Sequence, residues 1–174
     1  MANLILFLRI VHIVGGVFWA GGAFIMAWFV EPAVRAAGDD GRRFMQRLGA
    51  TGRFSSAMAA AAGATVLAGL WLLWIFSSGF LSSFFGTGRG LALGLGMFLG
   101  IAAFVVGFVM QNRPMRLMAG IGRTVAAAGG PPTPSQAAEM EKLTGTVRQG
   151  GRIVAGLLLV TVILMATARY LPSF

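Results

Sequence analysis

Four long apolar runs, separated by more polar stretches, dominate the hydropathy pattern of the chain. They cover about residues 4–30, 54–77, 91–111 and 153–171. Each run is long enough to cross the hydrocarbon core of a bilayer, which takes roughly 20 apolar residues in a helix. The pattern therefore predicts an all-α fold, an integral membrane four-helix bundle that forms a single transmembrane domain over residues 1–174.

The basic residues predict how the bundle is oriented in the membrane. Eleven of the fourteen lie in two connections, residues 31–53 and 112–152, and the other three are Arg9, Arg89 and Arg169. Since arginine and lysine accumulate in cytoplasmic loops, we expect both connections in the cytoplasm and both termini on the outer side. The expected location is the bacterial cytoplasmic (inner) membrane, and outside is then the periplasmic face.

The first long connection contains signals for a turn and for a short helix. Gly38-Asp-Asp-Gly41 predicts a turn. Arg42–Leu48 places apolar residues between arginines, which suits a short helix at the level of the lipid headgroups. Glu31 and Arg35 are four residues apart at the end of the first span, so they are expected to form a local ion pair.

Proline and glycine punctuate the second long connection and the short one. Asn112-Arg-Pro114 is expected to close the third span, and Gly129-Gly-Pro-Pro-Thr-Pro134 to break any helix. Thr133 before Pro134 predicts a capped helix start, and that helix feeds into the last span with a weak point at Gly150-Gly151. The connection from Gly79 to Gly90 is predicted to be a short apolar loop.

The composition indicates a membrane protein and excludes several kinds of metal site. Hydrophobic residues make up 57% of the chain and charged residues 11%, against about 25% charged in soluble domains. The net charge of +9 would suggest nucleic acid in a soluble protein, but here it follows the topology, so no nucleic-acid partner is expected. The absence of cysteine excludes thiolate metal sites, and a single histidine excludes a catalytic zinc site with three histidines.

The first apolar run carries that histidine, His12. It lies about nine residues into the run, so at ~1.5 Å per residue it is roughly 13 Å below the start and inside the hydrocarbon. An ionisable residue at that depth is expected to face the bundle interior and to be functional. Helical spacing places it on one broad face with five other residues: Arg9, Gly16, Trp19, Ala23 and Met26. Glycines 15, 16, 21 and 22 leave room beside it for a neighbouring helix or a flat cofactor.

Two interpretations of these residues remain open. In the first, neutral His12 ligates haem iron or, less favoured, a copper ion, with a methionine as second ligand. In the second, His12 is structural and donates a hydrogen bond to a backbone carbonyl or a threonine of another helix. Arg9, Arg89 and Arg169 either bind an anion, such as lipid phosphate or haem propionates, or extend to the headgroups. The candidate cofactor-binding residues are His12, Arg9, Trp19, Gly16, Met26, Arg89 and Arg169, with His12 as the candidate metal ligand.

His12-Ile-Val-Gly-Gly-Val-Phe-Trp-Ala-Gly-Gly22 resembles the first helix of the CopD-like group of small integral membrane proteins. It is also similar to that of the HemJ-type protoporphyrinogen oxidases, and Leu67-Ala-Gly-Leu70 and Met165–Leu171 look like uncharacterised four-helix relatives of the group. The resemblance implies a bundle whose first-helix histidine binds haem or copper. HemJ-type enzymes also use a lysine on the third span, and Arg89 is the nearest candidate here.

The sequence favours a non-enzymatic accessory or structural subunit of a membrane assembly, with haem binding through His12 as an additional hypothesis. The expected partners are the lipid bilayer and either other membrane subunits or a second copy. Gly90-x-x-x-Gly94 and Gly96-x-x-x-Gly100 offer a small-residue ridge for that docking. The alternatives are a HemJ-like haem-dependent porphyrin oxidoreductase and a CopD-like copper transport protein.

Overall fold

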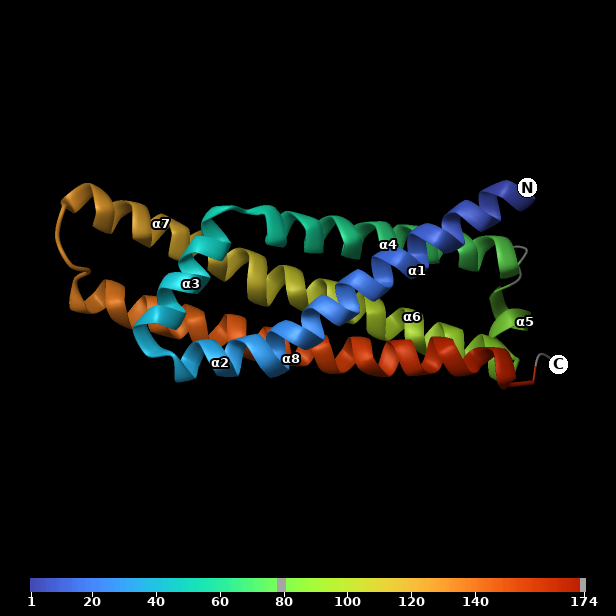
Figure 1. Ribbon diagram of the computed structural model, residues 1–174. Coiled ribbons are helices and arrows are strands. Elements are labelled where there is room, and N and C mark those ends of the chain that lie inside the picture. Colours follow the sequence, from blue (N-terminus) through green and yellow to red (C-terminus); the bar gives the residue numbers. More distant parts are fainter. Residues whose placement is uncertain (78–80, 173–174) are drawn as a thin grey trace.

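A computed structural model describes residues 1–77 and 81–172 (Figure 1). Four long helical segments lie side by side, and the start of α1 and the last described residues after η3 lie at one end of the bundle together with α5. The elements in chain order are α1 (Ala2–Ile25), η1 (Met26–Val30), α2 (Glu31–Ala36), α3 (Gly38–Ala50), α4 (Arg53–Ser77), α5 (Leu81–Phe85), α6 (Gly88–Gly107), η2 (Phe108–Asn112), α7 (Arg113–Ala128), α8 (Pro134–Thr167) and η3 (Ala168–Tyr170). We call the end that holds the start of α1 and α5 the terminal end, and the other the α3/α7 end.

The four predicted spans are confirmed as helices long and apolar enough to cross a membrane. The continuous segments are Ala2–Ala36, Arg53–Ser77, Gly88–Ala128 and Pro134–Tyr170. The third contains 41 residues. At about 1.5 Å per residue it is roughly 60 Å long, about twice the hydrocarbon thickness of a bilayer. This helix is therefore longer than a bilayer crossing requires.

The prediction that Asn112–Pro114 closes the third span is wrong, because the helix continues through Pro114 into α7. Proline lacks an N–H and its ring clashes with the carbonyl four residues earlier. The widened π-helical turn η2 immediately precedes it and accommodates that misfit. The first span follows the same plan, since η1 comes just before Pro32 and α2. In both spans, a π-turn keeps the chain helical where proline alone would predict an end.

Both long connections, predicted as loops over 31–53 and 112–152, are largely helical. Only Ala37–Gly38 turns between α2 and α3, so the turn predicted at 38–41 is displaced toward the N-terminus and both aspartates lie in α3. The predicted helix at Arg42–Leu48 is confirmed within α3. The predicted short loop at 79–90 contains α5 and the start of α6, and its residues 79 and 80 lie outside the described residues.

The predicted break and restart around Pro134 are confirmed. α7 ends at Gly129, whose φ of 65° is the left-handed conformation that glycine adopts without strain. Thr133 caps α8 in a reciprocal pair, because its Oγ1 accepts from the Gln136 N–H and the Gln136 side chain accepts from the Thr133 N–H. α8 then runs without interruption through Gly150, which packs directly against Met110. No weak point occurs there.

The bundle consists of two helical hairpins, α1 with α4 and α6 with α8, which pack on one another mainly through α1 and α8. In each hairpin a threonine of the second helix lies against glycines of the first: Thr65 contacts Gly15 and Gly16, and Thr161 contacts Gly96 and Gly100. Glycines allow the backbones to approach closely, which compensates for the lack of a hydrophobic driving force between helices in lipid. In the predicted ridge on the third span, Gly96 and Gly100 thus pack against α8 of the same chain, whereas Gly90 and Gly94 pack against Phe84 and Phe85 of α5.

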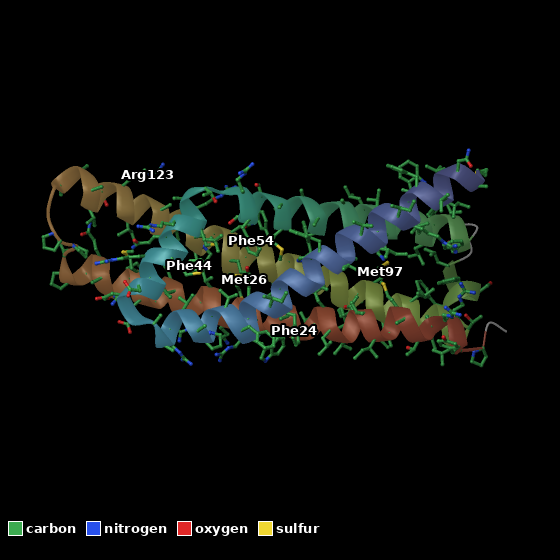
Figure 2. All side chains as sticks on the ribbon, in the orientation of Figure 1. Phe24, Met26, Phe44, Phe54, Met97 and Arg123 are labelled. Carbon is green, nitrogen blue, oxygen red and sulfur yellow. The ribbon has the colours of Figure 1, made fainter. Side chains whose placement is uncertain are left out.

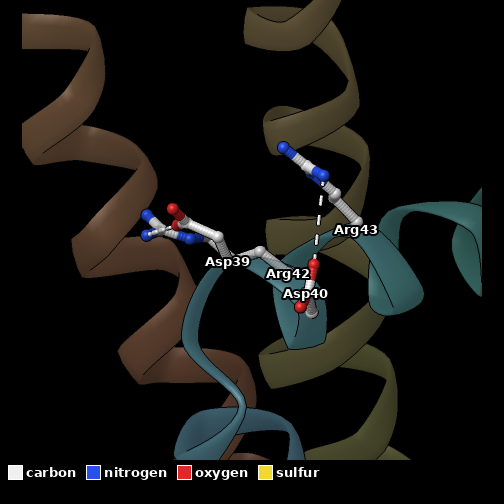
Figure 3. Close-up of polar contacts among 4 residues, drawn as sticks. All are labelled: Asp39, Asp40, Arg42 and Arg43. Atoms are coloured by element: carbon white, nitrogen blue, oxygen red, sulfur yellow. Dashed lines mark hydrogen bonds and ion pairs between the residues drawn. The ribbon is translucent and has the colours of Figure 1, made fainter.

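An ion-pair cluster joins the two hairpins at the α3/α7 end. Glu31 accepts from Arg148 at 2.9 Å and from Arg152 at 3.4 Å, both on α8. The predicted local pair of Glu31 with Arg35 is therefore wrong, because the proline-containing turn directs Glu31 toward α8. On α3, two further pairs join residues three apart: Asp39 with Arg42 and Asp40 with Arg43 (Figure 3). The side chains of both pairs are largely exposed, so the pairs contribute little to stability.

Candidate functional site

His12 on α1 is half-buried and is tied to α4 by a hydrogen bond. Its Nδ1 lies 2.8 Å from the backbone carbonyl oxygen of Thr65. Because a carbonyl oxygen can only accept, Nδ1 must carry the proton in this contact. In the neutral imidazole, Nε2 then bears the free lone pair. The structural interpretation of His12, a hydrogen bond to a carbonyl of another helix, describes the observed contact.

Gly69, one helical turn beyond Thr65, forms the space that the imidazole occupies. A methyl group added at Gly69 would lie 2.8 Å from Cε1 and 3.0 Å from Nδ1 of His12. Such distances are shorter than van der Waals contact, so any side chain at this position would displace the ring. Thr65 therefore supplies the hydrogen-bond acceptor for His12, and Gly69 supplies the socket, which is the space that the imidazole ring fills.

Side chains of α4 fill the space beside the glycines of α1. A Cβ at Gly15 would lie 2.6 Å from Thr65 Oγ1, one at Gly16 would lie 3.5 Å from Thr65 Cγ2, and one at Gly22 would lie 2.8 Å from Met58 Sδ. Of the two occupants predicted for this space, the structure contains the neighbouring helix. Gly21 is different, because nothing lies within 4 Å of a Cβ built there.

The other candidates on α1 do not gather around His12. Trp19 is buried in the core and packs edge-on against Phe104 of α6, with ring centroids 6.4 Å apart. Met26 lies in η1, toward the α3/α7 end (Figure 2). It follows His12 by fourteen positions, which is roughly 21 Å along a helix axis at 1.5 Å per residue. Met26 is therefore too far away to share a ligand with His12 in one chain.

The three arginines at the terminal end each meet aromatic or apolar surroundings. Arg9 lies over the ring of Phe76 on α4, with Cζ 5.1 Å from the centroid, and Arg169 lies over Tyr170 at 4.8 Å. Arg89 lines a cleft of about 370 Å³ whose wall also includes Phe76. Phe76 thus connects Arg9, which lies over its ring, with the cleft that Arg89 lines, whereas Arg169 contacts a different ring. Within residues 1–77 and 81–172, no carboxylate pairs with any of them.

Sequence reasoning missed Thr65, Gly69 and Phe76. The first two carried a usable signal, because a threonine followed four residues later by glycine puts a polar and a small residue on one face of an apolar helix. Phe76 lies near the end of the second apolar run, and its position in the sequence gives no sign of its contact with Arg9. In the part of the chain that the structure describes, no group of three or more histidine and carboxylate side chains is placed to hold a metal ion.

Comparisons with protein-family models, curated proteins and solved structures found no match to this chain. The resemblance of the His12–Gly22 segment to CopD-like and HemJ-type proteins therefore stays a prediction.

Proposed function

We propose that this chain is a non-enzymatic accessory or structural subunit of a membrane assembly, built to present a fixed set of transmembrane helix faces. The observation that carries the proposal is the use of its one intramembrane histidine. One ring nitrogen of His12, Nδ1, donates a hydrogen bond to the Thr65 carbonyl, and the ring lies directly against Gly69. An interhelical hydrogen bond of this kind fixes the rotation and register of α1 against α4, which a docking surface requires.

The outer surface of the bundle offers places for a partner helix. In the apolar parts of α1, α4 and α8, Gly21, Gly63 and Gly156 have no atom of the described chain within 4 Å of an added Cβ, and large exposed apolar side chains lie on the same helices. The glycines of the α6 ridge, in contrast, already face other parts of this chain: Gly96 and Gly100 face α8, and Gly90 and Gly94 face α5. We therefore expect another subunit or a second copy to dock on α1, α4 or α8, and not through the α6 ridge.

Haem binding through His12 is the second candidate, and one observation favours it. Ligating histidines commonly donate the other ring N–H to a carbonyl, which fixes the ring and exposes the second nitrogen as the ligand. His12 is held in that way, with Nε2 as the nitrogen that carries the lone pair. A bound haem would supply one-electron chemistry. In its support, Arg9 lies one helical turn from His12 toward the terminal end, where it could meet a propionate.

Purification from a native membrane tests the first proposal. The expected result is a defined complex in which chemical cross-linkers placed at Gly63 or Gly156 reach another chain, while cross-linkers at Gly96 do not. A compact monomer without partner chains in mild detergent would contradict the proposal. The predicted sidedness is tested separately with a reporter fused after Phe174. A reporter that works only outside the cytoplasm should be active there, and activity of a reporter that works only in the cytoplasm would contradict the predicted orientation.

An absorption spectrum of the same preparation tests the second candidate. Haem ligation predicts a Soret band that is lost in His12→Ala and kept in Gly63→Ala, a control at an open position of α4. A colourless, metal-free preparation would exclude both the HemJ-like oxidoreductase and the CopD-like copper protein as alternatives.

A further inference from the structure

The cleft at the terminal end combines apolar walls with unused hydrogen-bond donors. It lies between the end of α4, α5 and the start of α6 and has a volume of about 370 Å³. Its lining residues are Phe76, Ser77, Ser83, Phe84, Thr87, Arg89 and Leu93. Arg9 does not line the cleft, but its guanidinium lies over the ring of Phe76, which does.

The hydrogen bonds already made in this cleft identify the donors that remain. Ser77 donates to the Trp74 carbonyl and Thr87 to the Phe84 carbonyl, so both hydroxyl protons are committed. The guanidinium groups of Arg9 and Arg89 and the hydroxyl of Ser83 donate to no acceptor within the described residues. The donors available to a ligand are therefore mainly cationic, which suits a ligand that only accepts, such as a phosphate.

The charge distribution strengthens this match. All five acidic residues lie in α2, α3 and the first part of α8, at the α3/α7 end of the bundle (Figure 1). The terminal end thus holds three arginines with no acidic side chain to neutralise them. Desolvating cations at a membrane surface favours a negatively charged partner, and the lipid headgroup is the partner already present there.

We propose that this cleft binds the headgroup of an anionic phospholipid from the adjacent leaflet. Arg89 contacts the phosphate, Arg9 adds positive charge nearby from its position over the Phe76 ring, Ser83 donates a hydrogen bond, and Phe76, Phe84 and Leu93 face the glycerol and the start of an acyl chain. The apolar share of the wall favours a lipid over a small soluble anion, which would leave those three side chains uncovered.

Native mass spectrometry of the detergent-purified chain tests this site by counting bound lipids. The probes are dioleoylphosphatidylglycerol, which is anionic, dioleoylphosphatidylcholine, which is zwitterionic, and inorganic phosphate. The variants are Arg89→Gln and Arg9→Gln, with Arg169→Gln as the matched control, because it removes the same charge at the same end but lies on Tyr170. We expect the dissociation constant for phosphatidylglycerol to rise about tenfold in Arg89→Gln, a few-fold in Arg9→Gln and less than about twofold in Arg169→Gln.

Three results would overturn the proposal. Equal binding of phosphatidylcholine would show that the negative charge is not recognised. An equal loss in Arg169→Gln would show general attraction to the surface and no defined site. Displacement of phosphatidylglycerol by similar concentrations of inorganic phosphate would identify a soluble-anion site. Should Arg89→Gln fail to fold, Ser83→Ala at its exposed position replaces it, with an expected loss of about two- to threefold.

Discussion

Gly69→Ala is the sharpest test of the His12 socket. The added methyl group would lie 2.8 Å from Cε1 and 3.0 Å from Nδ1 of His12, so the ring must move away from the Thr65 carbonyl. Gly63→Ala is the matched control on the same helix, since a methyl group there meets nothing within 4 Å. Both variants change helix propensity equally, so the difference between them isolates the contact with His12.

The expected magnitude follows from three contributions. Alanine is more favourable than glycine in a helix interior by about 1 kcal/mol, which raises the stability of both variants. Interhelical hydrogen bonds in membranes contribute about 0.6 kcal/mol on average and up to about 1.7. Overpacking a tight contact costs about 1–3 kcal/mol, and the lower part of that range applies because an imidazole can rotate. We expect Gly69→Ala to be about 1 kcal/mol less stable than the parent chain and about 2 kcal/mol less stable than Gly63→Ala.

Unfolding in mixed micelles by sodium dodecyl sulfate, followed by circular dichroism, measures these free energies. A double-mutant cycle completes the design, because His12→Ala removes the side chain that the methyl group would displace. In the His12→Ala background, Gly69→Ala should cost nothing and should gain the helix-propensity term. The reasoning is refuted if Gly69→Ala is as stable as Gly63→Ala, or if its cost persists without His12.

Three further variants probe the remaining contacts. Gly41→Ala drives a methyl group into the Val34 carbonyl oxygen and should lower stability by about 2 kcal/mol or more, seen as faster proteolysis between α2 and α3. Gly49→Ala, on the open side of α3, should behave like the parent. Glu31→Gln should lower the free energy of unfolding by about 1 kcal/mol, because its two arginine partners on α8 are themselves partly solvated; an effect unchanged between low and high salt would argue against ion pairing. Thr65→Val should be neutral or stabilising by up to about 1 kcal/mol, since Oγ1 is buried without a partner in the described chain; a clear loss would reveal an acceptor for that hydroxyl.

The sequence predicted the spans well because a bilayer imposes a local rule. Every backbone group inside lipid must be bonded within its own helix, so an apolar run of sufficient length is already an element. The ends of the spans were less predictable. Proline usually marks a helix boundary, but at Pro32 and Pro114 a preceding π-turn carries the helix onward. Such a turn depends on packing against α8, which is not visible in the local sequence.

For contacts between helices, the sequence predicted only the kind of group that a residue would meet and not which residue of which helix supplies it. The depth of His12 and its apolar neighbours indicated either a ligand or a carbonyl or threonine of another helix, yet they could not select α4 or the register that places Thr65 opposite it. Glu31 shows the same limit, because the local spacing favoured Arg35 whereas the fold brings Arg148 within 2.9 Å. Local spacing ranks neighbours along one helix and carries no information about which helices meet.

The two hairpins pack their helices in the same way except at one level along the bundle, where the residue that lies on a glycine differs. In both, a threonine of the second helix lies on glycines of the first. One turn closer to the terminal end, the second hairpin places the apolar side chain of Met165 on Gly96, with Cγ 3.2 Å from a Cβ built there. In the first hairpin the two helices exchange roles at this level, because His12 of the first helix packs on Gly69 of the second. A thioether fills such a socket without any hydrogen bond. Packing alone therefore does not require an imidazole at this layer, and the polarity of His12 serves either the fixed register of α1 or the ligand that Nε2 can take.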